Sequence, residues 1–159
     1  LKDIEWFRTH RFERVSPMLG VVKMTVTGIE AGTQHNVVPA ECRFMVDVRV
    51  NECYQNEELL AEIREAVECD VQPRSTHLNS SAIALDHPAV VRLIEIGRVP
   101  FGSPTMSNQA VMPFTTLKLG PGDSARSHTA DEYVLLGEIA DAMELYFALL
   151  DNLKIEKTK

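Results

Sequence analysis

The feature that most constrains the fold is the segment ECRFMVDVRV, residues 41–50, in which apolar and polar side chains alternate. Alternation with a period of two places the two sets of side chains on opposite faces of a β-strand. The segment therefore predicts a half-buried strand with a charged outer face. The apolar face carries Cys42, Phe44, Val46, Val48 and Val50, and the outer face carries Arg43, Asp47 and Arg49.

A second alternating segment, VVKMTVT at residues 21–27, predicts another strand. The residues between the two segments include Gly28, Gly32 and Pro39, which favour a loop. Two shorter strands are expected at residues 71–78 and 114–120.

Apolar residues at helical spacing predict three helices. The first runs over residues 56–68 with Asn56 as its N-cap, because asparagine is a preferred capping residue. The second begins near Pro88 and closes at Gly97, and the third covers residues 133–152. A change in composition at residues 80–84 predicts a boundary between two modules.

Charge and composition exclude several classes of partner. The chain has 159 residues and a formal net charge of −7, and its Lys and Arg residues form no dense cluster, so nucleic acid is not an expected partner. No stretch approaches the about 20 apolar residues that a membrane span needs, so no membrane is expected either. Three cysteines without CxxC spacing favour a reducing compartment, and the cytoplasm is the expected location.

The candidate functional residues gather in KLGPGDSARSHTADEY, residues 118–133. His128 lies there beside Asp123 and Asp131, where it is either a metal ligand or general base, or a surface histidine bonded locally. Thr129 and Glu132 have the spacing of a capping box for the following helix.

Two further polar residues have ordinary structural interpretations, and neither is specific by itself. Asn36 lies in the glycine-bounded loop, where asparagine is a common turn residue. Arg49 lies on the polar face of the predicted strand, where pairing with Asp47 is the default interpretation. The remaining histidines have no HxH or HxxxH spacing, so no zinc site is expected from short-range ligands within this chain.

Two motifs together carry a family resemblance. GIEAGTQHNVVPAECRFMVDVRV resembles the G-x-x-x-N-x-(I/V)-P and D-x-R segment of the zinc-dependent aminoacylase family, and GPGDSARSHTADEY resembles its GPG and H-x-x-x-E segment. The family includes acetylornithine deacetylase, succinyl-diaminopimelate desuccinylase and carboxypeptidase G. The second motif is most similar to the acetylornithine and acetylcitrulline deacetylase branch.

The resemblance implies a mixed α+β and α/β fold in two parts. Residues 1–80 are expected to be part of a ferredoxin-like lid that makes a homodimer, and residues 81–159 the C-terminal segment of an α/β metallopeptidase catalytic domain. His128 matches the family's final metal ligand. Asn36, Arg49, Gly120 and Gly122 match positions that contact substrate.

The resemblance also implies the activity. Such an enzyme hydrolyses an acetyl or succinyl group from an amino acid such as ornithine or citrulline, as in arginine biosynthesis. It holds two zinc ions per full-length subunit, or else cobalt or manganese, which activate water and polarise the amide carbonyl.

The family's other metal ligands and its general-base glutamate precede the lid, so this chain is expected to be a C-terminal portion that is inactive by itself. The alternative is a non-catalytic dimerisation or ligand-binding module.

Overall fold

The computed structural model describes residues 1–155, and the chain divides into two compact units. The first unit comprises residues 1–81 and 102–113, and the second comprises residues 82–101 and the chain from residue 114 onward. The last four residues of the expected catalytic segment, 156–159, lie outside the described part of the chain.

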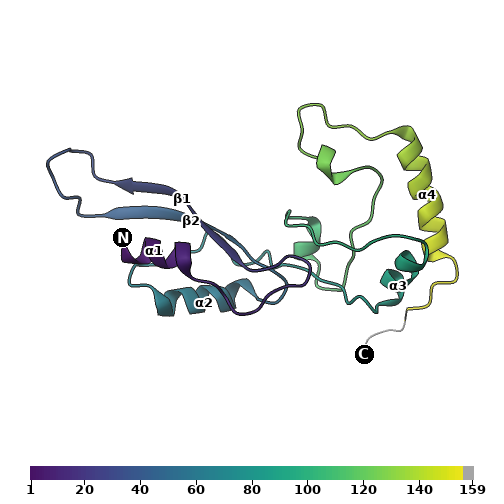
Figure 1. The fold of residues 1–159 in the computed structure, drawn as a ribbon, viewed down its shortest axis with the longest axis horizontal. Coiled ribbons are helices and arrows are strands. Elements are labelled where there is room, and N and C mark those ends of the chain that lie inside the picture. The colour runs from purple at the N-terminus through teal and green to yellow at the C-terminus, as the bar shows by residue number, and fades with distance from the viewer. Residues whose placement is uncertain (156–159) are drawn as a thin grey trace. The chain divides into compact units, whose positions relative to one another are not determined.

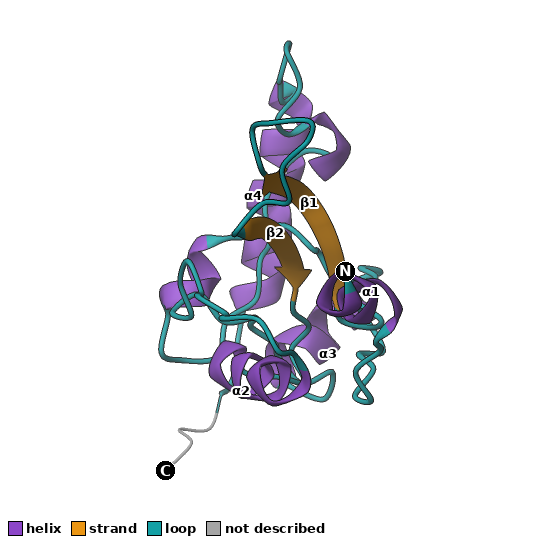
Figure 2. Ribbon diagram, turned by 90° about the vertical axis from the view of Figure 1, so that its left-hand side faces the viewer, coloured by secondary structure: helices purple, strands orange, loops and turns teal. Residues whose placement is uncertain are grey.

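The first unit is built on an antiparallel pair of strands, β1 (Lys23–Ala31) and β2 (Cys42–Arg49). Figure 2 shows the two strands side by side. Both predicted strands are confirmed, but β1 runs four residues further than expected and ends at Ala31. Gly28 does not begin a loop, because an irregularity between Val26 and Gly28 shifts the register and lets pairing continue.

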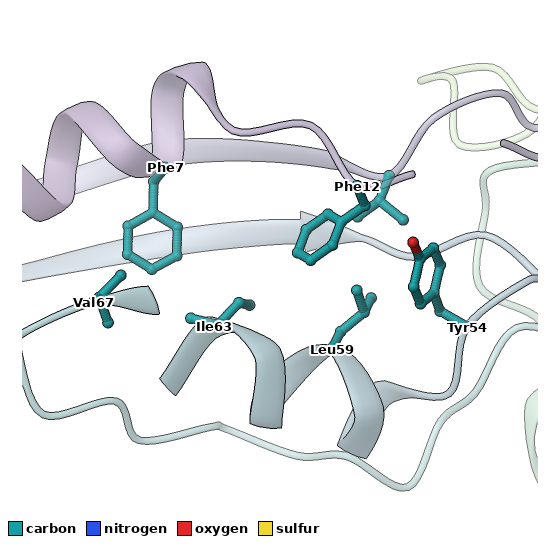
Figure 3. Packing of buried hydrophobic residues seen from close by; sticks show 7 residues of the cluster. Phe7, Phe12, Tyr54, Leu59, Ile63 and Val67 are labelled. Atoms are coloured by element: carbon teal, nitrogen blue, oxygen red, sulfur yellow. The ribbon is translucent and has the colours of Figure 1, made fainter. Parts of the chain in front are cut away.

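Two helices, α1 (Lys2–Thr9) and α2 (Asn56–Ala66), lie on the same side of this hairpin (Figure 1). Their apolar side chains and those of the strands form one core. Figure 3 shows the buried side chains that α1, α2 and the neighbouring segments contribute to it. The inward residues of β1 and β2 pack against this core as the alternation predicts, except that Cys42 is exposed. The buried members of the core are Phe7, Phe12, Val22, Tyr54, Leu59, Ile63 and Val67.

A buried amide joins three segments of the first unit. Asn51 is 1% exposed, and its Nδ2 donates to the carbonyl oxygens of Arg14 at 3.2 Å and Gly20 at 2.8 Å. Its Oδ1 accepts from the backbone N–H of Cys53 at 3.0 Å. Because a buried amide without partners is costly, this set of bonds holds the segment before β1 against the end of β2.

The N-terminus of α2 differs from the prediction. Gln55 is the N-cap, and the carboxylate of Glu58 accepts from its backbone N–H at 3.5 Å. Asn56 instead uses its Nδ2 to reach the carbonyl oxygens of Thr76 and Leu78, at 3.1 and 2.9 Å, while Asn79 Oδ1 accepts from the Asn56 backbone N–H at 2.8 Å.

The predicted strand at residues 71–78 is therefore wrong. This segment is a loop whose carbonyls bind the side chain of Asn56 rather than a neighbouring strand.

The second unit contains α3 (Pro88–Glu95) and α4 (Leu136–Leu150). Both predicted helices are confirmed, with Pro88 at the start of α3 and Gly97 in the left-handed region just after it, although α4 begins three residues later than expected. They share a small core of Ala89, Leu93 and Leu149.

The strand expected at residues 114–120 is absent, and the segment has no regular secondary structure. In the described part of the chain, two short 3₁₀ helices, η1 (Asn108–Val111) and η2 (Ser124–Arg126), interrupt the loops.

The described residues therefore form a mixed α+β protein whose hairpin and covering helices are consistent with part of a ferredoxin-like fold. Between residues 1 and 155, no helix is both long and apolar enough to span a membrane.

We expect Leu59→Ala to lower the free energy of unfolding of the first unit by about 2–5 kcal/mol, because the side chain is 2% exposed and its removal leaves a cavity in the core. Fluorescence of the single tryptophan, Trp6, reports on this unit because the residue packs against that core. The control is Val38→Ala in the same unit, at a position that is 92% exposed, where we expect a change within about 0.5 kcal/mol. Equal effects of the two substitutions would contradict this core.

Candidate functional site

The outer face of the hairpin carries one group of candidate residues. Arg43, Asp47 and Arg49 alternate with the inward residues of β2, and Arg49 is paired in register with Lys23 of β1. The Nε atom of Arg49 lies 2.6 Å from Oδ2 of Asp47, and the two side chains are 61% and 45% exposed. This confirms the predicted surface ion pair. The two terminal nitrogens of the Arg49 guanidinium take no part in it and can donate to another group.

Asn36 lies in the loop between the strands and is exposed. Gly32 begins this loop with a φ of +68°, and a Cβ atom at this position would lie 3.2 Å from Cβ of Pro39. The tight start of the loop thus depends on glycine. Val38, in the same loop as Asn36, is 92% exposed. The tip of the hairpin therefore presents both the Asn36 amide and apolar groups to solvent.

The second group of candidates belongs to the loop before α4, which is held together by Arg126. Its guanidinium forms a short ion pair with Glu138 and lies 4.7 Å from the centre of the Tyr133 ring. Glu138 also accepts from the backbone N–H of Leu135 at 2.9 Å, so one carboxylate both caps α4 and anchors the loop. Gly122 has a φ of +85°, and its Cβ would lie 3.4 Å from Val134, whereas Gly120 has open space around it.

The predicted capping box of Thr129 and Glu132 is wrong. Thr129 Oγ1 donates to the carbonyl oxygen of Arg126 at 2.7 Å, and Glu132 accepts from the backbone N–H of His128 at 3.0 Å. These bonds close the loop on itself, and the capping role falls to Glu138 in the first turn of α4.

His128 is exposed at the turn that these bonds form. Its φ is +63°, an uncommon conformation for a residue with a Cβ atom. The bond from its backbone N–H to Glu132 stabilises this turn, and its imidazole has no hydrogen bond or ion pair to any of residues 1–155. The side chain is thus presented outward from a constrained backbone.

The ion pair shifts the pKa of both partners. The hydrogen bond from Arg126, followed by the one from the Leu135 backbone, holds the pKa of the Glu138 carboxyl below its ordinary value. The same contact with Glu138 raises the pKa of Arg126. Both groups are therefore charged at neutral pH. The polar side chains of Arg126, Thr129 and Glu132 stabilise the fold of this loop through bonds to other residues of the loop and of α4.

The described residues do not by themselves fit a metal ion. Among residues 1–155, no three histidine, cysteine, aspartate or glutamate side chains lie close enough together to hold one. His128 belongs to no such group of three, so the described residues alone do not complete a metal site around it. The two groups of candidates belong to different units, Asn36 and Arg49 to the first and Gly120, Gly122 and His128 to the second.

Comparison with known families adds one finding for the first unit. Residues 18–73 match the M20 peptidase dimerisation domain. The matched range contains both strands of the hairpin and α2, and it supports a relationship to the M20 peptidases, which are hydrolases, and the formation of a homodimer. No curated protein matches the chain.

Sequence reasoning missed two residues that organise these groups. Glu138 stands three residues after its N-cap, but that N-cap is Leu135 rather than serine or threonine, so the capping-box pattern does not identify it. Lys23 belongs to the polar face of β1, but only the strand register places it opposite Arg49.

Acidification tests the ion pair of the second unit. The pKa of Glu138 is lower in the folded protein than in the unfolded chain, where it is about 4.3. The ion pair therefore contributes its full stabilisation above about pH 4.3, and this stabilisation is lost as the pH falls through the pKa of the folded protein. We expect the ¹³C NMR titration midpoint of the Glu138 carboxyl to rise toward about 4.3 in Arg126→Gln. An unchanged midpoint would show that Arg126 does not hold this carboxylate in solution.

Proposed function

We propose that this chain is the C-terminal portion of a cytoplasmic, zinc-dependent hydrolase that removes an acetyl or succinyl group from an amino acid such as ornithine or citrulline. The observation that supports it most is the dimerisation-domain match over residues 18–73, which contains the D-x-R motif of Asp47 and Arg49. The loop that presents His128 lies in the other unit and carries the second motif of the resemblance.

Arg49 has the properties of a carboxylate-binding residue in this proposal. It lies on the face of the hairpin opposite the helices, and its only ion pair among residues 1–155 uses Nε. The terminal nitrogens can then grip the two oxygens of an α-carboxylate, which is the strongest geometry for this pair of groups. Asn36, at the tip of the same hairpin, supplies an amide that can donate to or accept from the acyl group.

His128 is the proposed metal ligand of the second unit. A left-handed backbone held by Glu132 presents the imidazole away from the loop, and Gly122 permits the tight turn that precedes it. In the family that the motifs resemble, the other ligands and the general base come from sequence that precedes the lid. The proposed active site therefore needs residues beyond those of this chain.

The rival function is a non-catalytic dimerisation or ligand-binding module. A hairpin with one covered face can associate through its strand edges without any metal. Metal content separates the two functions, because the module needs none.

We expect His128→Ala in the complete protein to lower the bound zinc per subunit and to abolish most hydrolysis of N-acetylornithine, because loss of a first-shell ligand empties or distorts a metal position. The matched control is His77→Ala, at an exposed histidine in a loop of the first unit, which should retain zinc and activity. Zinc content is measured by atomic emission, kcat by release of acetate, and folding by circular dichroism. Wild-type zinc and kcat in His128→Ala would favour the rival module.

A further inference from the structure

The outer face of the hairpin holds two cations directly opposite each other. Lys23 of β1 is paired with Arg49 of β2, so the two side chains leave the sheet on the same face. Both are exposed, and α1 and α2 pack against the other face. Like charges in directly opposed positions destabilise a strand pair, which makes this arrangement unfavourable unless something else compensates it.

Asp47 compensates only part of the positive charge of Lys23 and Arg49. Asp47 lies opposite Thr25 in the register, one step along the same face, and pairs with Arg49. Within residues 1–155, no ion pair holds the ammonium group of Lys23. Lys23, Asp47 and Arg49 together thus carry one uncompensated positive charge in a chain whose net charge is −7.

The other end of the hairpin has an excess of negative charge. Arg43 lies opposite Glu30 and forms an ion pair with Glu41 at 3.2 Å. Its positive charge is therefore more than matched by acidic neighbours. The excess of positive charge is a local property of the end formed by Lys23 and Arg49.

Asp47 also orients the guanidinium. Its Oδ2 accepts a hydrogen bond from Nε of Arg49 at 2.6 Å. This bond occupies the Nε side of the guanidinium, and the end that carries the two terminal nitrogens stays available to a ligand. An anion that meets Arg49 from this end can form two parallel hydrogen bonds, while the ammonium of Lys23 contributes a mobile point charge beside it.

We propose that Lys23 is a second carboxylate-binding residue, which acts together with Arg49 while Asp47 positions the Arg49 guanidinium. One uncompensated positive charge matches a single negative charge, and the anionic group of the proposed substrate is a carboxylate. This inference rests on the proposed function in one respect: it assigns the carboxylate to an N-acyl amino acid. A neutral or cationic amide is then a poor ligand for this face.

Binding is measured without any hydrolysis, by NMR titration of this chain labelled at the Arg Nε and Lys Nζ atoms. The probe is N-acetyl-L-ornithine, and its matched control is N-acetylputrescine, which has the same acyl and ammonium groups but no carboxylate. We expect shifts of the Lys23 and Arg49 signals with the first compound only. Lys23→Gln should weaken binding about two- to fivefold, Lys23→Arg should restore it, and Lys2→Gln on α1 should leave it unchanged.

The positioning role of Asp47 has a readout of its own. In Asp47→Asn, we expect the Arg49 Nε–H signal to shift upfield and to exchange faster with water, because the charged acceptor is lost. An unchanged signal would overturn this role.

Equal shifts with both compounds, or equal affinity in Lys23→Gln and the wild type, would overturn the carboxylate site. Neither result bears on whether the complete protein is a hydrolase, which is decided by its zinc content and acetate release.

Discussion

The pairing of β1 with β2 in one register is the constraint on which the rest of the first unit depends. This register puts Met24, Val26 and Val48 on the side of the helices and Lys23, Asp47 and Arg49 on the other side. A slip by one residue would exchange the two faces and bury charges in the core. The same hydrogen bonds therefore determine both the hydrophobic core and the charged surface.

Two buried or partly buried amides keep the surrounding segments in place. Asn51 ties the chain before β1 to the end of β2, and Asn56 ties α2 to the loop at residues 76–79. In the second unit, the ion pair of Arg126 and Glu138 has the same role for the loop that presents His128. Each unit thus combines an apolar core with a polar connection that sets the path of one loop.

Periodicity predicted the elements whose structure depends on local patterns. Alternation at residues 21–27 and 41–50 identified both strands, and Pro88 with Gly97 delimited α3, because these signals act within a few residues of each other. The strands expected at residues 71–78 and 114–120 failed because a strand also needs a neighbour, which no local pattern supplies.

The candidate site was predicted less completely than the fold. The ion pair of Arg49 with Asp47 could be anticipated from their spacing in one strand, but the position of Lys23 opposite Arg49 depends on a pairing over 26 residues of sequence. The capping box at Thr129 was wrong because its glutamate bonds to His128, and the capping glutamate follows a leucine. Whether Asn36, Arg49, Gly120, Gly122 and His128 act on a substrate stays a prediction.

The central claim is that the hairpin and α2 form a dimerisation module, and sedimentation equilibrium of this chain tests it most directly. Within residues 1–155 the sheet has only two strands, so each strand has an unpaired edge, and the chain matches a dimerisation domain. We therefore expect a two-fold dimer, whose mass should rise with concentration from 17.8 kDa to twice that value. Measurements from micromolar to millimolar protein cover the expected transition. A mass of 17.8 kDa at every concentration would contradict the account.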